Sequence, residues 1–121
     1  MPAIASRVIL FVDEIGRMTD FYTNVIGLVV KSNSDGFVVL DAGAIELALH
    51  QLPELYADPE GAGAAREDSY FKLVFHSDDV AGERESLTAR GVRMREIVRY
   101  DGIEFCDGLD PEGNVIQISS R

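Results

Sequence analysis

The chain contains two histidines, and each follows a charged side chain at a spacing of four residues. Glu46 and His50 lie in one apolar run typical of a β-strand, and Lys72 and His76 lie in another. Because side chains at even spacing in a strand point to the same face, each pair could line a cleft. A separation of about 13 Å along the strand argues against both members of a pair binding one metal ion. Each histidine is therefore either a polar residue at a strand end or a group that contacts a ligand or transfers a proton.

Other patterns that carry chemistry are missing from the sequence. It has no glycine-rich phosphate loop, no Gly-x-Ser-x-Gly turn and no cysteine with an obvious histidine partner. The single cysteine, Cys106, cannot form a disulfide within the chain, which favours a reducing compartment. Nothing near it in the sequence would lower the pKa of its thiol, so we expect Cys106 to be a packing residue.

Aromatic and acidic side chains offer two further binding features. Most phenylalanines and tyrosines fall at core or interface positions, whereas Tyr56 lies in a predicted loop and is the best aromatic candidate for a ligand contact. Asp101, Glu104 and Asp107 form an acidic ribbon late in the chain. A solvated face is favoured for this ribbon over a cation-binding groove.

The composition excludes several classes of protein. The 121 residues carry a formal net charge of −10, which argues against a nucleic-acid partner because phosphates are bound by a surplus of lysine and arginine. An acidic surface either serves solubility or attracts a cationic small molecule. No apolar run approaches the roughly 20 residues of a membrane-spanning helix, and the first residues lack the pattern of a signal peptide. We therefore expect a cytoplasmic protein without membrane association.

One supersecondary unit occurs twice in the sequence. An alternating apolar run with an acidic helix start spans 7–15, and the same arrangement recurs 65 residues later at 72–80. Each is followed by a helical stretch that ends at a glycine, and then by short strands. The predicted elements are a strand at 6–12, a helix from 13 or 14 to Gly27, strands at 28–32, 37–41 and 44–50, a strand at 70–76, a helix at 78–90, and strands at 92–100, 103–107 and 114–119. We predict an α+β fold in a single domain, 1–121, with βαβββ modules at 6–52 and 69–121 joined by a linker at 53–68.

Periodicity and turn signals add detail to these elements. Asp-Gly pairs at 35–36 and 101–102 predict hairpin turns. Helical spacing predicts an inward face for each helix. These inward residues are Ile15, Met18, Phe21, Tyr22, Val25 and Ile26 in the first helix, and Val80, Leu87 and Ala89 in the second.

Three segments give the chain a resemblance to a known superfamily. They are Asp-Phe-Tyr-Thr-Asn-Val-Ile-Gly-Leu at 20–28, Asp-Asp-Val at 78–80 and Asp-Pro-Glu-Gly-Asn-Val-Ile-Gln-Ile at 110–118. In these segments the chain resembles the vicinal oxygen chelate superfamily, which contains glyoxalase I, bleomycin resistance proteins and extradiol dioxygenases. The resemblance implies two βαβββ modules whose sheets curl into a cleft, usually within a dimer. Metal-using members bind one divalent ion there.

The resemblance also implies where metal ligands would stand. Arg7, Glu46, Lys72 and Gln117 occupy the positions where metal-using members have His, Glu, His and Glu. Arginine is not deprotonated in proteins, and two cations repel an incoming metal ion. We therefore expect no cofactor, with a divalent metal disfavoured, and an Arg7–Glu46 ion pair instead. The four residues either tie the two halves together or line a ligand pocket.

Two functions follow from the resemblance and from the way the chain differs from metal-using members at the metal-ligand positions. The first is a metal-free protein that binds a small organic molecule, as a sequestering or carrier protein. The alternative is a glyoxalase-like lyase or isomerase, or a dioxygenase, in which Glu46 is the general base and Lys72 or Arg7 stabilises an enolate. In either case we expect a homodimer, because half-open sheets leave edges and apolar faces that a partner covers. The expected ligand-binding residues are Arg7, Glu46, His50, Tyr56, Lys72 and Gln117.

Overall fold

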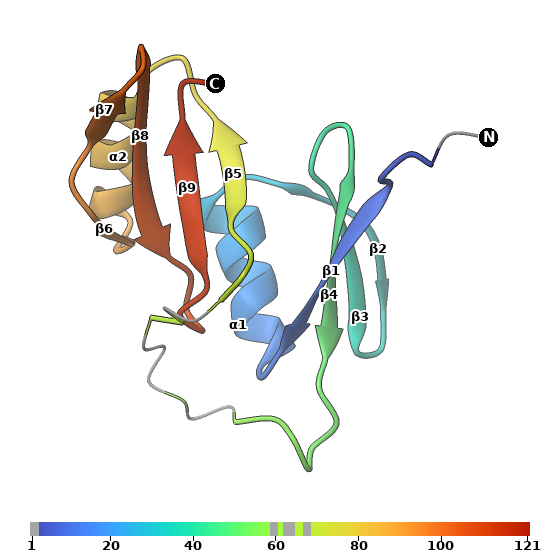
Figure 1. The fold of residues 1–121 in the computed structure, drawn as a ribbon. Helices are drawn as coiled ribbons and strands as arrows, with labels where there is room; N and C mark the ends of the chain where they lie inside the picture. Colours follow the sequence, from blue (N-terminus) through green and yellow to red (C-terminus); the bar gives the residue numbers. More distant parts are fainter. Residues whose placement is uncertain (1–2, 59–60, 62–64, 67–68) are drawn as a thin grey trace. The chain divides into compact units, whose positions relative to one another are not determined.

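The computed structural model describes residues 3–58, 61, 65–66 and 69–121. The chain forms two compact units, Met1–Gly61 and Ala62–Arg121, each with one β-sheet (Figure 1). The predicted α+β class is confirmed. Residues 59–60, 62–64 and 67–68 of the predicted linker lie outside the described residues. Within the described part of the chain, no helix is long and apolar enough to cross a membrane.

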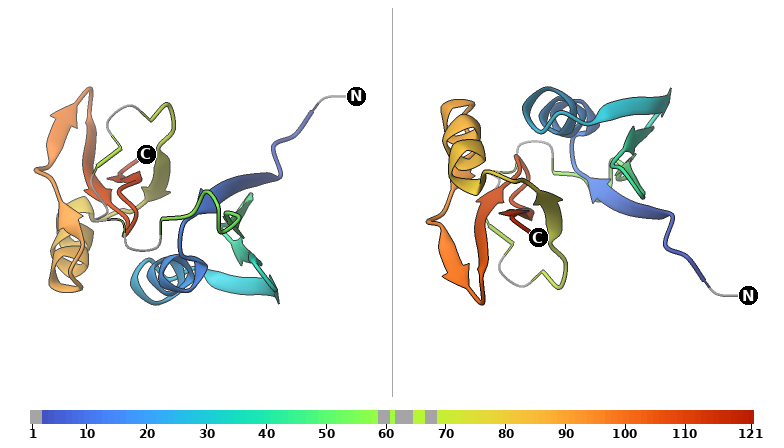
Figure 2. Two further views of the ribbon diagram at one scale, coloured as in Figure 1. Left: turned by 90° about the horizontal axis from the view of Figure 1, so that it is seen from below. Right: turned by 90° about the horizontal axis from the view of Figure 1, so that it is seen from above.

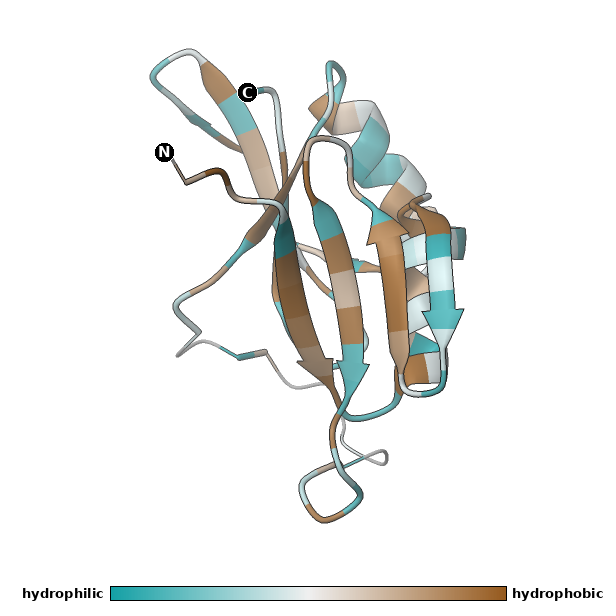
Figure 3. Cartoon of the chain, turned by 90° about the vertical axis from the view of Figure 1, so that its right-hand side faces the viewer, coloured by the Kyte–Doolittle hydropathy of each residue, from teal (hydrophilic) through white to brown (hydrophobic). Residues whose placement is uncertain are grey.

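The first unit is a four-stranded sheet in the order β1-β4-β3-β2. β1 runs parallel to β4, whereas β3 pairs antiparallel with both β4 and β2. Figure 3 looks onto this sheet and shows hydrophobic strands β1 and β3, with the hydrophilic strand β2 at one edge. A polar edge strand limits unwanted pairing with other chains. The elements are β1 (Arg7–Val12), α1 (Ile15–Asp20), the π-helix η1 (Phe21–Val25), β2 (Val29–Ser34), β3 (Phe37–Asp41) and β4 (Glu46–Gln51).

The helix of the first unit starts directly after Glu14, close to the start at 13 or 14 that the sequence predicts. The Glu14 carboxylate accepts hydrogen bonds from the backbone N–H groups of Gly16 and Arg17, which caps the first turn of α1. The helix continues as η1, whose wider turn bonds the Ile26 N–H to the Phe21 carbonyl at 3.0 Å. Gly27 then ends it with a φ of +100°, a conformation that favours glycine.

The core of the first unit lies between this helix and one face of the sheet. From the predicted stripe, Met18, Phe21 and Tyr22 are buried, whereas Ile15, Val25 and Ile26 are only half-buried. The sheet contributes alternate residues from its central strands to the same core. These include Val38 and Leu40 on β3 and Leu47 and Leu49 on β4.

The second unit repeats the strand order of the first. Its sheet runs β5-β9-β8-β6, with β7 also paired to β8, so the first strand again lies beside the last and parallel to it. Helix α2 packs against β8 and β9 on one face of the sheet (Figure 2). The elements are β5 (Leu73–His76), α2 (Val80–Ala89), β6 (Arg93–Met94), β7 (Val98–Tyr100), β8 (Ile103–Leu109) and β9 (Val115–Ser119).

Two predicted strands of the second unit differ from the structure. The strand expected at 70–76 begins only at Leu73, because the Ser69 hydroxyl bonds both the N–H and the carbonyl of Phe71 in a local turn. The strand expected at 92–100 is split into β6 and β7. At the break, the Arg95 carbonyl accepts a 2.7 Å hydrogen bond from Nε of Arg84 on α2, while the Arg95 N–H still bonds the Asp107 carbonyl of β8 at 2.8 Å.

Helix α2 follows its predicted bounds closely but not its predicted inner face. Asp79 caps it by accepting a 3.0 Å hydrogen bond from the Gly82 N–H. Val80 and Leu87 are buried as expected, whereas Ala89 is exposed. The assignment of Ala89 was wrong because two residues rotate a helix by about 200°, which places it opposite Leu87.

The turns that close the strands explain the glycine pattern of the sequence. Both predicted Asp-Gly turns are present, with φ values of +73° at Gly36 and +76° at Gly102, and Asp101 also has a positive φ of 52°. Consecutive positive φ values at 101–102 match the tight hairpin turn that fits strand twist.

The Asp-Pro-Glu-Gly-Asn segment is a buried turn between β8 and β9. One oxygen of Asp110 accepts hydrogen bonds of 2.9 Å from the N–H groups of Glu112 and Asn114, and its other oxygen accepts one of 2.8 Å from the Asn114 side chain. Asp110 is fully buried, and Gly113 has a φ of +83°. This part of the sequence therefore serves the fold.

Candidate functional site

Each sheet has a second face, opposite its helix, that carries most of the candidate residues. In the first unit the cross-strand row Arg7, Glu46 and Asp41 lies on this open face, and a second row of Phe11, His50 and Phe37 lies four residues further along. In the second unit, register places Val74, Gln117 and Asp107 in one row. Side chains in such a row project from the same side of the sheet.

The Glu46 cluster, formed by Arg7, Lys31 and Glu46, is the charged centre of the first open face. Arg7 donates from Nε at 3.0 Å and from Nη2 at 2.8 Å to Oε1 of Glu46, which confirms the predicted ion pair. Lys31 Nζ lies 2.7 Å from Oε2 of the same carboxylate. Lys31 was not predicted, because the register shift between Val30 and Ser32 breaks the alternation that would have placed it.

These contacts fix the ionisation of the cluster. The hydrogen bonds from Lys31 and Arg7 lower the pKa of Glu46 below its ordinary value of 4.5. The hydrogen bond between Lys31 and Glu46 is also the main reason why the pKa of Lys31 is raised above its ordinary value of 10.5. Glu46 is therefore a stable carboxylate at neutral pH, and a weak acceptor of protons.

The aromatic cluster of the first unit consists of Phe11, Phe37 and His50. The His50 ring lies 5.3 Å from each phenylalanine ring, tilted against Phe11 and edge-on to Phe37. The Arg7 guanidinium carbon lies 5.7 Å from the Phe37 ring centre, within the range of a cation–π contact. Phe11 is 56% exposed, so the open face presents an apolar and aromatic surface beside the Glu46 cluster.

The Asp107 cluster, formed by Lys72, Asp107 and Gln117, is the charged centre of the second open face. Lys72 Nζ lies 3.0 Å from Oδ2 of Asp107, and the Gln117 amide donates to Oδ1 at 3.0 Å. The Asp107 side chain is only 19% exposed. Its assignment to a solvated acidic ribbon was wrong, because strand pairing sets it between these two donors.

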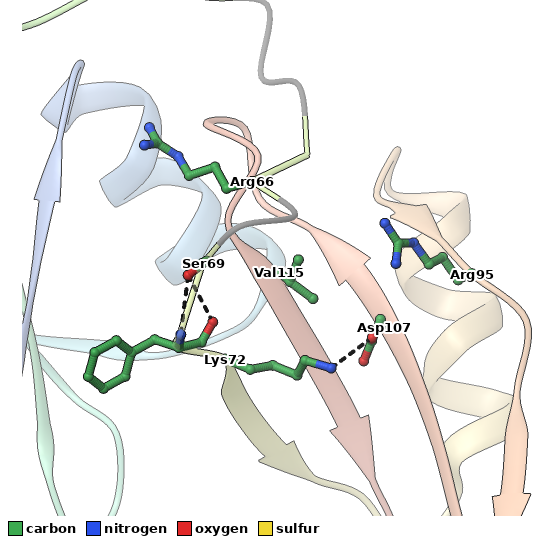
Figure 4. A pocket seen from close by; sticks show the side chains of 7 residues that line it. Arg66, Ser69, Lys72, Arg95, Asp107 and Val115 are labelled. Carbon is green, nitrogen blue, oxygen red and sulfur yellow. Dashed lines mark hydrogen bonds and ion pairs between the residues drawn. The ribbon is translucent and has the colours of Figure 1, made fainter.

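A pocket of about 300 Å³ adjoins the Asp107 cluster within the second unit (Figure 4). Three basic side chains line it, two of which the sequence did not indicate, because neither Arg66 nor Arg95 lies in a recognisable motif. Arg66 Nε donates to the Glu112 carbonyl at 3.1 Å, which holds this arginine at the rim of the buried turn. The lining residues are Arg66, Ser69, Phe71, Lys72, Arg95, Asp107 and Val115.

Three further residues considered in the sequence lie outside these clusters. Nε2 of His76 lies 2.9 Å from Oδ1 of Asp78, an almost fully exposed residue, as expected for a polar group at a strand end. Tyr56 lies in the turn after β4 with 69% of its surface exposed, and its contact with a ligand stays a prediction. Cys106 is 1% exposed, and burial raises the pKa of its thiol, which confirms a packing role.

Residues 4–118 match the model of the Glyoxalase/Bleomycin resistance protein/Dioxygenase superfamily. The chain belongs to this superfamily. The resemblance seen in the sequence is therefore confirmed over nearly the whole chain.

Solved structures of the superfamily fold cover the chain almost completely. The protein SMU.1112c is 26% identical, with a TM-score of 0.79, and the match covers 97% of this chain and 98% of that one. TnmS3, an antibiotic binding protein from Streptomyces sp. CB03234, is 18% identical with a TM-score of 0.74 and coverage of 97% and 94%. Lactoylglutathione lyase from Agrobacterium tumefaciens is 20% identical with a TM-score of 0.74 and coverage of 98% and 93%. No curated protein sequence matches the chain.

The superfamily implies a divalent metal, and the residues at its positions do not fit one. Both oxygens of Glu46 bind cationic side chains, and a guanidinium cannot donate a lone pair to a metal. Lys72 and Gln117 bind Asp107 as hydrogen-bond donors. The part of the chain that the structure describes holds no group of three or more His, Cys, Asp or Glu side chains placed to bind an ion.

Proposed function

We propose that this superfamily member is a metal-free protein that binds a small organic molecule, as a sequestering or carrier protein. The observation that carries the proposal is the Glu46 carboxylate, whose two oxygens are held by Arg7 and Lys31 at 2.8 and 2.7 Å. Fixed cations take the place of a metal ion there. The site then offers charge and hydrogen bonds for recognition, without a Lewis acid.

The surface beside this carboxylate suits binding. Apolar and aromatic groups with a few convergent polar groups are typical of small-molecule sites, and Phe11, Phe37 and His50 provide such a surface on the open face. TnmS3, which has the same fold, is an antibiotic binding protein. That likeness supports the proposal at the level of the fold alone.

The alternative, a lyase, isomerase or dioxygenase with Glu46 as general base, is less well supported. A general base works best when its pKa lies near the working pH. Lys31 and Arg7 move the pKa of Glu46 in the opposite direction. A lyase such as that from Agrobacterium tumefaciens shares the fold with this chain at 20% identity.

We also propose a homodimer, because large apolar side chains remain exposed on both units. Phe11 is 56% exposed, Phe71 82% and Tyr100 75%. Exposed apolar surface of this kind often marks an interface. Light scattering should give a molar mass twice the 13.3 kDa of one chain, and a mass of 13.3 kDa would exclude the homodimer.

Metal analysis and ligand binding together test the proposed function. Elemental analysis of the dialysed protein should find no stoichiometric transition metal, and EDTA should leave the thermal midpoint unchanged. A thermal-shift screen of neutral and charged aromatic compounds should find a stabilising ligand whose effect is lost in Phe37→Ala. Leu55→Ala is the matched control, because Leu55 is 83% exposed in the turn after β4. A stoichiometric metal that resists dialysis would overturn the proposal, as would a screen in which no compound stabilises the protein.

A further inference from the structure

The pocket of the second unit is lined by three basic side chains, in a chain whose net charge is −10. Among the described residues that line it, Arg66, Lys72 and Arg95 are basic and Asp107 is acidic. A basic pocket in an acidic chain is an attractive site for an anion, because the local field opposes that of the surrounding surface.

Arg95 is the cation of this pocket with the greatest freedom to bind a ligand. Its backbone N–H, directly after β6, donates to the Asp107 carbonyl on β8 at 2.8 Å, so the two residues lie side by side. Figure 4 shows the Arg95 side chain extending toward the side of the pocket where Val115 lies. Among the described residues, the Arg95 guanidinium forms no hydrogen bond or ion pair, so its planar donors remain available for an oxyanion.

Lys72 is the second cation, and Asp107 holds it in place. The Lys72 side chain is 42% exposed and its ammonium has three donors, of which the Asp107 contact at 3.0 Å uses one. Asp107 therefore positions Lys72 and also competes with any anion that enters. Phe71, at 82% exposed, and Val115 add apolar surface to the same pocket.

We propose that this pocket binds the oxyanion of a small organic acid through Lys72 and Arg95, with the apolar part of the ligand against Phe71 and Val115. The volume of about 300 Å³ is at the lower end for ligand sites, which favours a compact molecule. The inference rests on the proposed binding function and names its ligand class. It also decides between the two signs of charge that the composition left open.

Four compounds with the same ring and different charge test the ligand class. Titrations of the full chain with benzoate, phenyl phosphate, benzamide and benzylamine, followed by calorimetry at low salt, separate an anion from a neutral or cationic ligand. We expect both anions to bind at least about tenfold more tightly than the other two compounds. Their affinity should fall as salt is added, because exposed charges are screened. The ratio of the two anions shows whether the site prefers carboxylate or phosphate.

Three variants locate the anion within the chain. Arg95→Gln should weaken benzoate binding roughly tenfold, whereas Arg99→Gln, the same change on an exposed arginine of β7 outside the pocket lining, should leave it unchanged. Asp107→Asn should strengthen benzoate binding, because it removes the carboxylate that competes for Lys72. A gain of affinity cannot arise from a damaged fold, and circular dichroism checks that Arg95→Gln is folded.

These experiments test the ligand class, the location of the site and the proposed function separately. If benzamide or benzylamine binds as tightly as the two anions, the proposal that the ligand is an anion is overturned, whereas the proposal that the protein binds a small molecule stands. Benzoate binding that Arg95→Gln leaves unchanged overturns the location. If none of the four compounds binds, this inference fails, whereas the proposed function is still decided by the metal analysis and the wider ligand screen.

Discussion

The guanidinium of Arg7 lies 2.8 Å from the carboxylate of Glu46, across the parallel pair that joins the first and last strands of the first unit. The second unit has the same strand order but a different charge pairing. Register sets Leu73 opposite Ile116 and Val74 opposite Gln117, so Lys72 has no acidic residue across from it on β9. It bonds Asp107 on β8 instead, with Gln117 as the second donor. The two units share one strand topology, and in each unit two side chains donate hydrogen bonds to one carboxylate.

The Glu46 cluster predicts a specific dependence of stability on pH. A carboxyl whose pKa is lowered in the folded protein stabilises it above the unfolded pKa, and this contribution is lost as pH falls through the folded pKa. The pKa of Glu46 is lowered from 4.5 by Lys31 and Arg7. We therefore expect Glu46→Gln to be less stable than the wild type at pH 7, with a difference that shrinks below about pH 4.5. Urea unfolding at several pH values measures this.

The same cluster gives a direct titration experiment. Arg7→Ala and Lys31→Ala should each raise the pKa of Glu46, as followed by the NMR shift of its side-chain carboxyl carbon. A Glu46 resonance that titrates identically in the wild type and both variants would contradict the cluster geometry.

The buried turn before β9 should be essential for stability. Asp110→Ala leaves the N–H groups of Glu112 and Asn114 without their acceptor, and each unpaired buried donor costs about 1–3 kcal/mol. Asp35→Ala, at the exposed turn before β3, changes the same residue type where no donor of the described residues depends on it, and should cost less. Chemical unfolding compares the two free energies. Equal losses would show that the Asp110 hydrogen bonds add nothing.

Cys106 should be protected from thiol reagents in the folded protein. Its side chain is 1% exposed and its pKa is raised by burial, so both access and thiolate formation are suppressed. We expect reaction with a disulfide reagent to be slow in buffer and rapid in concentrated urea. Rapid labelling in buffer would mean that β8 opens readily.

Much of the architecture could be predicted from the sequence because it depends on local rules. Alternation of apolar residues placed the strands, and acidic residues before apolar runs marked both helix starts, as the caps at Glu14 and Asp79 confirm. Positive φ values at Gly27 and Gly91 show why each helix ends where its glycine stands. The Arg7–Glu46 pair could be predicted because it depends on the resemblance and on the cost of leaving a charge unpaired.

The sequence by itself determined the repeated fold, the superfamily and the presence of Arg7 and Lys72 at two of the expected metal-ligand positions, since these follow from residue type and spacing along the chain. Only the tertiary structure decided which groups meet. Lys31 reaches Glu46 through a bulge in β2, and Asp107 lies between Lys72 and Gln117 because three strands align there. Arg95 joins that pocket from the segment between β6 and β7, where a hydrogen bond from Arg84 holds its carbonyl. Register, bulges and long-range hydrogen bonds connect residues far apart in sequence, and no local pattern encodes them.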